Sequence, residues 1–467
     1  MEGARGCRAE NLAVGTGFIT NTTGARGFQV GIDASGWMYR ACKRHRITES
    51  PQLVALFARC SRLFRLPFIP VFVFDGLWRP NVKRGKVILG NDHPLTESFQ
   101  LMLDGFGFEW LVAPGEAEAT LSMMTASGIP VRVDAILTDD SDSFVFGART
   151  VLCIRSKDNE NYEASQYSAD DISTLLGLSR NEFILIAILA GGDYSDGLRN
   201  CGVATAIGLA RAGLGAQLVA TLSNRELLDP LETWREALRH ELRTNTSGLL
   251  PHRCPQLANT IPADFPDPAI INLYLHPTVS EPAVAGDLVF RSPRFDVLAR
   301  FAEDNFQWGD SIGILDHFAD HLFAGFVIRE LACRASVTDG IVASSPSPSV
   351  IKRIVGEHRH KSTGYLAELR LTLSLDPAIL TTALQAIDGR RNPPEGARTA
   401  VAAWIKEKLP KVRVWVPKSM IEHVFPTMVL DYTCTQCNGG AAQRRRQTQQ
   451  PVIDPSSFSG TSSGSIT

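Results

Sequence analysis

Short apolar runs alternate with longer segments of helical periodicity along the first 215 residues. Runs rich in Val, Ile and Phe are typical of buried strands, and apolar residues that recur every three to four positions are typical of helices. Strands are therefore predicted at residues 28–32, 71–74, 110–112, 135–138 and 151–154, and helices at 51–64, 116–127 and 181–189. Strands that alternate with helices form a parallel sheet with helices on its faces. The predicted fold class is α/β, with a mostly parallel central sheet flanked by helices.

Carboxylates follow the predicted strands at the points where the strands end. Asp33 and Asp75 each close an apolar run, and five more acids follow in short clusters. In α/β sheets, sites form outside the carboxyl ends of the strands, so these acids can meet at one edge. Neighbouring carboxylates raise one another's pKa unless a bound cation holds them ionised. The sequence therefore predicts a divalent-metal site made by Asp33, Asp75, Glu116, Glu118, Asp140, Asp142 and Asp193.

Each of these acids has a simpler interpretation when it is taken alone. An aspartate at the end of a strand is often a helix N-cap, and Glu-x-Glu is common on exposed helices. Asp140-x-Asp142 after a strand also opens haloacid dehalogenase phosphatases, but these have threonine or valine where this chain has Phe144. Glu116 and Glu118 can converge only in the first turn of a helix, because two positions rotate a helix by roughly 200°. The joint pattern of all the acids is what favours a metal site.

The composition is that of a globular protein with two or three domains. The chain has 467 residues, of which 44% are hydrophobic and 21% charged. Nine cysteines spread from Cys7 to Cys437 suggest no disulfide framework, and no apolar segment of a signal peptide follows Met1. No apolar run is expected to reach the length of a membrane span. We therefore expect an intracellular, reducing compartment and no membrane partner.

The net charge of −2 conceals two regions of opposite charge. Residues 40–86 contain eleven Lys or Arg against two acids, whereas residues 91–195 contain seventeen acids against five bases. A basic flank beside an acidic pocket suits a polyanion that is gripped along its backbone while one phosphate reaches a metal. A second interpretation stays open for Arg59, Arg62 and Arg65, which can be the solvated face of an amphipathic helix.

Five short motifs, in this order along the chain, resemble those of the XPG-like flap endonuclease superfamily. They span residues 31–35, 72–76, 113–119, 138–142 and 189–194, and the resemblance covers about residues 28–215. The interval between Asp75 and Glu116 is too short for the long helical arch of flap endonucleases, and a small domain follows the core. Within the superfamily the chain is therefore most similar to the fungal Holliday-junction resolvases, which carry a chromodomain-like C-terminal module.

The resemblance implies a catalytic site with two magnesium ions, for which Mn²⁺ can substitute. Asp33, Asp75, Glu116 and Glu118 match the ligands of one ion, and Asp140, Asp142 and Asp193 match those of the other, with several contacts through water. The implied activity is structure-specific cutting of branched double-stranded DNA, such as Holliday junctions and 5' flaps, by phosphodiester hydrolysis in DNA repair and recombination. A nuclear location and a homodimer on junction DNA are implied as well.

Two further segments resemble DNA-binding parts of the same superfamily. Residues 197–206 resemble its helix-two-turn-helix, where Gly202 and Thr205 are expected to contact DNA and a potassium ion is implied. Asn200 stands where many relatives have the first glycine of that turn. The basic residues after Asp75 match the start of the gateway to the active site; they are Arg79, Lys83, Arg84 and Lys86.

The expected domain order follows from these matches and from changes in composition. Residues 1–27 form a divergent N-terminal segment, and residues 28–215 form the PIN/XPG-like nuclease core with the helix-two-turn-helix. A partly irregular core extension at 216–333 is followed by a Ser-Pro linker at 334–349. A small, chromodomain-like α+β domain is expected at 350–432, and a disordered tail at 433–467.

Two functional hypotheses remain open from the sequence. The first is an active, magnesium-dependent structure-specific endonuclease, which the seven acids favour. The second is a catalytically decayed protein of the same fold that still binds branched DNA. It is favoured by the opening Met1-Glu2-Gly3, which replaces the Met-Gly start of the superfamily.

Overall fold

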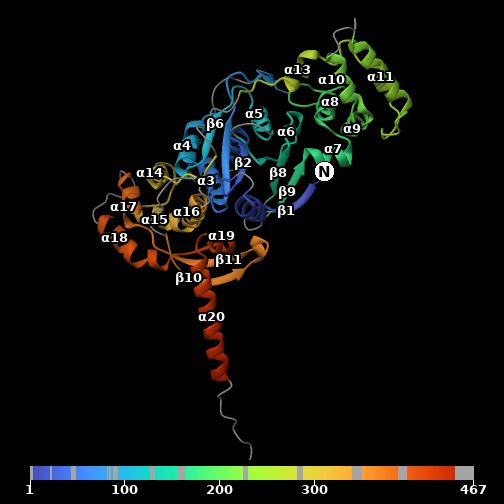
Figure 1. The fold of residues 1–467 in the computed structure, drawn as a ribbon. Helices are drawn as coiled ribbons and strands as arrows, with labels where there is room; N and C mark the ends of the chain where they lie inside the picture. The colour runs from blue at the N-terminus through green and yellow to red at the C-terminus, as the bar shows by residue number, and fades with distance from the viewer. Residues whose placement is uncertain are drawn as a thin grey trace, which may run out of the picture.

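A seven-stranded sheet forms the centre of the computed structural model (Figure 1). The structure describes residues 4–21, 24–43, 49–80, 82–83, 86–87, 93–126, 132–155, 163–223, 230–280, 288–338, 350–387 and 397–447. The strands lie in the order β1-β9-β8-β7-β2-β3-β6. Strands β8, β7, β2, β3 and β6 are parallel, whereas β9 and β1 extend the sheet in antiparallel fashion. The predicted mostly parallel α/β sheet is confirmed.

The predicted strands are present with small shifts of their ends, and two more lie at one edge of the sheet. The strands are β1 Ala4–Arg8, β2 Phe28–Asp33, β3 Phe68–Phe74, β6 Glu109–Val112, β7 Ala135–Leu137, β8 Thr150–Arg155 and β9 Glu163–Ser168. Every residue of β3 is buried, as expected for a strand covered on both faces. Alternate β3 side chains enter two different cores, Phe68, Phe72 and Phe74 on one face and Ile69, Val71 and Val73 on the other.

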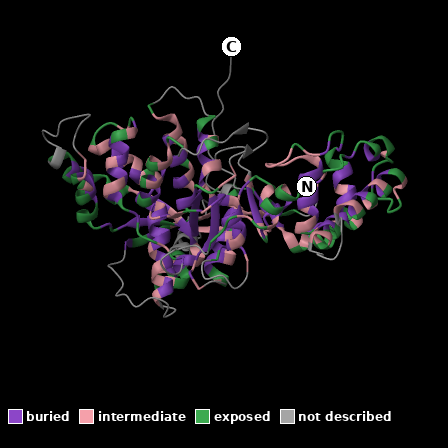
Figure 2. Cartoon of the chain, turned by 90° about the horizontal axis from the view of Figure 1, so that it is seen from above, coloured by how far each residue is buried: buried purple, intermediate pink, exposed green. Residues whose placement is uncertain are grey.

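Helices cover both faces of this sheet. Helices α2 Ala34–Cys42, α3 Pro51–Phe64 and α4 Thr96–Phe106 contribute to the first core, and α5 Ala117–Met124, α6 Asp142–Val145 and α8 Arg180–Ala190 contribute to the second. Figure 2 shows the buried residues concentrated along the sheet and on the inner sides of the helices. The helices predicted at residues 51–64, 116–127 and 181–189 correspond to α3, α5 and α8.

The N-terminal segment packs as part of the core. Strand β1 pairs with β9 at the edge of the sheet, and α1 Ala9–Asn11 with the wider helical turn η1 Leu12–Thr20 follows it. Ala9, Ala13 and Phe18 have no exposed surface. This segment therefore contributes to the same hydrophobic core as the helices α2 and α3.

A helical lobe lies at one end of the molecule, shown in green in Figure 1. It contains α7 Ala169–Leu176, α8, α9 Val203–Leu209, η2 Ala210–Leu214, α10 Gly215–Ser223, α11 Pro230–Thr244, α12 Pro255–Asn259 and α13 Pro268–Leu275. Helices α14 Phe295–Asn305, α15 Ser311–His321 and α16 Phe323–Thr338 then return to the first core. Helix α16 continues into the segment predicted as a linker, and residues 339–349 lie outside the described residues.

A C-terminal unit follows, built on an antiparallel sheet with the order β10-β11-β12. Its elements are β10 Ile351–Arg359, η3 Lys361–Thr363, β11 Ala367–Leu373, α17 Pro377–Gln385, α18 Ala397–Glu407, η4 Leu409–Lys411, β12 Arg413–Pro417, α19 Lys418–Val424 and α20 Pro426–Gln447. Leu369 and Val416 belong to the first core, so this unit packs against the body that holds the central sheet. A small α+β arrangement is therefore present, and its chromodomain-like character stays a prediction.

The C-terminal end differs from the expected disordered tail. Helix α20 continues to Gln447, fifteen residues into the segment predicted to lack structure, and projects from the body (Figure 1). Its first turns are anchored by Val429, Met428 and Tyr432, which pack on the first core. An anchored first turn removes the nucleation cost, and Ala, Gln and Arg then propagate a helix well despite their polarity. Residues 448–467 lie outside the described residues.

One helical stretch of the described chain, Val203–Leu222, is long and apolar enough to cross a membrane, contrary to the expectation from the sequence. Its mean hydropathy is 1.4 over 20 residues. Two bent helix pairs pass the same test when each is counted as one span, Ala169–Leu176 with Arg180–Ala190 and Ser311–His321 with Phe323–Val337. In this fold Gly213, at φ 84°, interrupts the stretch, and Leu209 and Leu218 pack into the second core.

Candidate metal and nucleic-acid site

Four adjacent parallel strands bring the predicted acids toward one edge of the sheet. Asp33 is the last residue of β2, and Asp75 follows β3 directly. Glu116 comes shortly after β6, and Asp140 comes shortly after β7. The strands β7, β2, β3 and β6 are neighbours and run in the same direction, so their carboxyl ends share one edge of the sheet. We call this edge, with Asp33, Asp75, Glu116 and Asp140, the acid edge.

Asp33 caps a helix and also has a raised pKa. Its carboxylate accepts hydrogen bonds from the backbone N–H of Ser35 at 2.8 Å and of Gly36 at 3.0 Å, so it caps α2. Burial and then the neighbouring charge of Asp75 raise the pKa of Asp33 to about 7. The capping hydrogen bonds and Arg40 oppose that rise only in part. The N-cap interpretation and the functional one therefore both apply to this residue.

Asp75 connects β3 with the start of α5. One carboxylate oxygen accepts from the backbone N–H of Ala117 at 2.9 Å, and the other lies 3.4 Å from Arg79. Glu116 is the N-cap residue of α5, with extended backbone, and Glu118 lies in the first helical turn. Both glutamates are therefore in the first turn, which is the placement their spacing required.

Tyr194 connects the loop that carries Asp193 to the same helix start. Its hydroxyl donates to a carboxylate oxygen of Glu116, which is only 5% exposed. The Tyr194 ring lies against Tyr274 with 4.7 Å between ring centroids. Tyr194 stood in the sequence motif around Asp193, but its role as a partner of Glu116 was not predicted. It holds a buried carboxylate in place, which a neighbouring aspartate could not do.

Asp140 and Asp142 form a local pair at the start of α6. A carboxylate oxygen of Asp140 accepts from the backbone N–H of Asp142 at 3.1 Å. Helix α6 is fixed against α5 because the Ser122 hydroxyl donates to the Ser143 carbonyl at 3.1 Å. The neighbouring Asp139 points to a different partner, Arg40, at 2.7 Å. Asp139, which is not among the predicted ligands, therefore has a protein partner of its own.

The donor set suits magnesium, although the side chains do not form a closed ligand shell. All seven acids offer carboxylate oxygens, the ligands that hard divalent cations prefer. The raised pKa of Asp33 is the signature of a carboxylate that a nearby cation would keep ionised. Among the described residues, however, no group of three or more His, Cys, Asp or Glu side chains is arranged to hold a metal ion. Contacts through water, as expected from the sequence, relax that requirement.

The basic residues after β3 occupy a short hairpin. Strands β4 Val82–Lys83 and β5 Lys86–Val87 pair so that Lys83 lies opposite Lys86. Arg79 comes before this hairpin and is half-buried beside Asp75. Arg84 lies outside the described residues. The described part of the hairpin therefore carries two lysines on paired backbone positions close in sequence to the acid edge.

The turn between α8 and α9 is compact at its first glycine and open at its second. Gly197 has φ 81°, and a side chain there would meet the Gly191 backbone nitrogen at 2.5 Å. Asn200 adopts φ 67°, a conformation that asparagine tolerates. Gly202 is the exposed N-cap residue of α9, whereas Thr205 is only 7% exposed. A DNA contact in this turn would therefore come from backbone groups near Gly202, not from the Thr205 side chain.

The chain is similar to proteins that are described as DNA repair proteins and flap endonucleases. A family model described as the XPG I-region matches residues 107–193. The DNA excision repair protein ERCC-5 homolog of Xenopus laevis is 31% identical over 210 residues, which are 45% of this chain and 16% of that protein. The Flap endonuclease GEN homolog 1 of Mus musculus is 30% identical over 36% of this chain and 20% of its own length. The chain thus matches no more than about a fifth of the length of these relatives.

The solved structures it resembles cover nearly the whole chain. A eukaryotic junction-resolving enzyme GEN-1 binding with cesium has a TM-score of 0.70 and 26% identity, covering 93% of this chain and 97% of that one. The Holliday junction-resolving enzyme GEN1 in complex with product DNA and Mg²⁺ has a TM-score of 0.68 and 27% identity, with the same coverage. The likeness therefore includes the C-terminal unit as well as the central sheet.

Proposed function

The chain belongs to the XPG-like flap endonuclease superfamily, and from that premise we propose that it is a magnesium-dependent, structure-specific endonuclease that cuts branched DNA. The observation that carries the proposal is the gathering of acids from four adjacent strand ends at one edge of the sheet. A protein that only binds DNA gains nothing from such an edge, because carboxylates repel phosphates. Bound cations reverse that repulsion.

The proposed chemistry divides the acids between two Mg²⁺ ions, for which Mn²⁺ can substitute. Asp33, Asp75, Glu116 and Glu118 would hold one ion. Asp140, Asp142 and Asp193 would hold the other. Magnesium at this edge would supply an activated water and stabilise charge on the leaving 3'-oxygen. The products would be a 5'-phosphate and a 3'-hydroxyl.

Other residues keep these acids in place for that chemistry. Tyr194 fixes the orientation of the Glu116 carboxylate through its hydroxyl. The backbone N–H of Ala117 does the same for Asp75. Because these partners belong to different elements, they connect Asp75 with the start of α5, and the start of α5 with the loop that carries Asp193. Such positioning lowers the reorganisation that substrate binding requires.

The proposed substrate is branched double-stranded DNA, as Holliday junctions or 5' flaps, in repair and recombination in the nucleus. The Lys83 and Lys86 hairpin and Arg79 would contact the phosphate backbone beside the acid edge. Backbone groups near Gly202 would contact a second stretch of duplex, where a potassium ion is a further expected component. Solved relatives are described with potassium, with product DNA and with Holliday junction DNA. Two copies of the chain on one junction would allow paired cuts.

A second candidate function is branched-DNA binding without catalysis. It is favoured by one observation, that no three acidic, His or Cys side chains of the described residues are arranged to hold a metal ion. On that view the acid edge is retained from a nuclease ancestor, and the DNA-binding segments alone are functional.

Cutting and binding assays on defined substrates separate the two. The purified chain would be incubated with a labelled four-way junction, a 5' flap and plain duplex, each with Mg²⁺, Mn²⁺ or EDTA. We expect metal-dependent cutting of a branched substrate and none of plain duplex. Glu118→Gln should abolish cutting and preserve binding, whereas Glu97→Gln, on an exposed position of α4, should change neither. Binding without cutting in either metal would favour the second candidate.

A further inference from the structure

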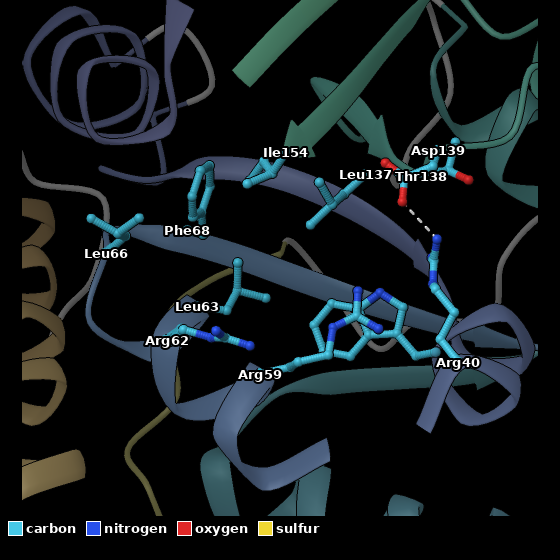
Figure 3. A pocket seen from close by; sticks show the side chains of 11 residues that line it. Arg40, Arg59, Arg62, Leu63, Leu66, Phe68, Leu137, Thr138, Asp139 and Ile154 are labelled. Carbon is cyan, nitrogen blue, oxygen red and sulfur yellow. Dashed lines mark hydrogen bonds and ion pairs between the residues drawn. The ribbon is translucent and has the colours of Figure 1, made fainter. Parts of the chain in front are cut away.

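A cavity of about 110 Å³ lies between α2, α3 and the strands β3, β7 and β8 (Figure 3). None of the seven acids lines it, although Arg40 acts on the charge of Asp33 and Asp139 precedes Asp140 in the chain. Five apolar side chains form much of its lining, including the fully buried Phe68. The polar part of the lining consists of Trp37, Arg40, Arg59, Arg62, Thr138 and Asp139. Three of these six are arginines, so the cavity combines an apolar wall with an unusual concentration of cationic donors.

Several of these donors have no acceptor. The indole Nε1 of Trp37 and the Nε of Arg40 are buried and have no hydrogen-bond partner. Trp37 itself is only 3% exposed. No acceptor for the Arg59 guanidinium exists among the described residues; it lies instead over the Trp37 ring, 3.8 Å from the ring centroid. Buried polar groups are nearly always paired, so donors left open beside a cavity indicate a ligand that accepts hydrogen bonds.

The charges around the cavity point to an anion. The one carboxylate of the lining, Asp139, is taken up by Arg40 at 2.7 Å, the ion pair drawn in Figure 3. Burial, together with the charges of Arg40 and Arg62, lowers the pKa of Arg59 to about 10, against a smaller opposing contribution from Asp139. Arg59 still carries its charge at neutral pH, so its desolvation and the repulsion from its neighbours are costs of the folded state. An anion between the guanidiniums would offset both.

We propose that this cavity is a binding site for a single tetrahedral oxyanion of the phosphate type. A cavity of about 110 Å³ has room for one phosphate group. Trp37 Nε1, Arg40 Nε and the Arg59 guanidinium are the donors that it would use. The anion can come from free phosphate or from the backbone of a nucleic-acid strand. Neither source requires the acid edge to be catalytic, so the site stands or falls independently of the proposed nuclease activity.

Thermal unfolding of the full chain in sodium phosphate, compared with sodium chloride at equal ionic strength, measures binding of the free anion. We expect phosphate to raise Tm in a dose-dependent manner that fits a single site. Arg59→Met keeps the apolar stem and removes the charge, and should weaken the apparent phosphate affinity at least about tenfold. Trp37→Phe keeps a ring under Arg59 and removes the N–H donor, and should weaken it about threefold. Arg253→Ala, on an exposed loop, controls for the loss of one positive charge.

Duplex DNA provides the second arm of the experiment. If the site takes a backbone phosphate, Arg59→Met should lower duplex affinity and reduce the slope of log affinity against log salt by about one, whereas Arg253→Ala should not. If it takes the free anion, the variants should lose the phosphate effect on Tm while duplex affinity stays unchanged. Equal responses of the parent, Arg59→Met, Trp37→Phe and Arg253→Ala in both arms would overturn the proposal. Urea unfolding in chloride alone shows whether each variant is folded.

Discussion

Carboxylates have different charged neighbours at the acid edge of the central sheet and in the C-terminal unit. In the C-terminal unit each of two strand glutamates meets a partner, Glu357 with Lys418 at 3.0 Å and Glu368 with His358 at 3.0 Å. At the acid edge the nearest strong influence on Asp33, after burial, is another carboxylate, Asp75. In the C-terminal unit these two carboxylates each have a basic partner, whereas at the acid edge Asp33 and Asp75 have protein partners and also act on each other as like charges.

The difference separates structural acids from functional ones. Surface ion pairs satisfy charge inside the chain and require no ligand. Crowded carboxylates raise one another's pKa and lower stability, and a bound cation offsets that cost. In the proposed function, a metal ion completes the acid edge. The C-terminal unit contributes packing, since its buried residues belong to the core shared with α2 and α3.

The largest expected effect is on the cutting rate, when one carboxylate of the predicted metal site is replaced by an amide. Asp142→Asn should reduce cutting of a branched substrate by at least about a hundredfold, because a neutral amide no longer holds the second cation. Glu357→Gln removes a carboxylate from the C-terminal unit and should leave the cutting rate within about twofold, since its partner is Lys418 of the same unit and it is not one of the seven acids. Initial rates on a labelled 5' flap in Mg²⁺ measure both. Equal losses of cutting rate in the two variants would contradict the proposal that the acids of the predicted metal site are catalytic and Glu357 is not.

A core substitution in the C-terminal unit should lower the free energy of unfolding and leave the cutting rate per folded molecule unchanged. Leu369 has no exposed surface, so Leu369→Ala is expected to lower the free energy of unfolding by about 2–5 kcal/mol. Urea unfolding followed by circular dichroism measures the change. The cutting rate per folded molecule, measured well below the transition, should match the parent. A large loss of that rate would mean that the unit takes part in catalysis.

The raised pKa of Asp33 predicts that replacing its carboxylate by a neutral amide increases the free energy of unfolding, and that the increase depends on pH. Because this pKa is raised from 3.8 to about 7 in the fold, the stability that Asp33 confers is complete below about pH 4 and is lost as the pH rises through 7. Asp33→Asn keeps an oxygen to cap α2 and removes the charge. In EDTA it should therefore stabilise the protein by up to about 4 kcal/mol more at pH 8 than at pH 4, at about 1.4 kcal/mol for each unit of the pKa shift.

Denaturant unfolding at both pH values tests this expectation, with Glu357→Gln as the control. A difference between Asp33→Asn and the parent that does not change with pH would show that Asp33 is an ordinary cap. Saturating Mg²⁺ should reverse the order at pH 8, because only the parent gains from binding the ion.

The smallest effect is expected from the ion pair between Glu357 and Lys418. Glu357→Gln should change the free energy of unfolding by less than about 1 kcal/mol, and by less still in 1 M salt. A double-mutant cycle with Lys418→Met measures the coupling. A coupling of several kcal/mol would contradict the view that acids in this unit are modest surface features.

The sequence was sufficient to predict the strands that carry strong apolar runs. Strand β3 illustrates this, since a strand buried on both faces requires an almost continuous apolar run. Strands β9 and β1 could not be found in the same way. In Glu163–Ser168 only Ala164 and Tyr167 are buried, and Ala4–Arg8 has no buried residue. Their place depends on backbone pairing with each other and with β8, which leaves no periodic pattern.

The candidate site was predictable to a similar extent. Asp33, Asp75, Glu116 and Asp140 could be placed at one edge because each follows a strand, and parallel strands end at a common edge. Their role as metal ligands stays a prediction. The partners that fix them were not found, since the contact of Tyr194 with Glu116 joins separate loops. The cavity beside α3 was missed for a related reason. Arg59 fits the solvated face of an amphipathic helix, and only the tertiary structure places it over Trp37 from another helix.

The central claim is that the acids from four strand ends bind a pair of divalent cations. Anomalous diffraction from crystals of the full chain grown with Mn²⁺ tests it most directly. The account predicts two Mn²⁺ peaks at this edge, one against Asp33, Asp75, Glu116 and Glu118 and one against Asp140, Asp142 and Asp193. Absence of both peaks at saturating Mn²⁺, with these carboxylates in the positions described above, would contradict it.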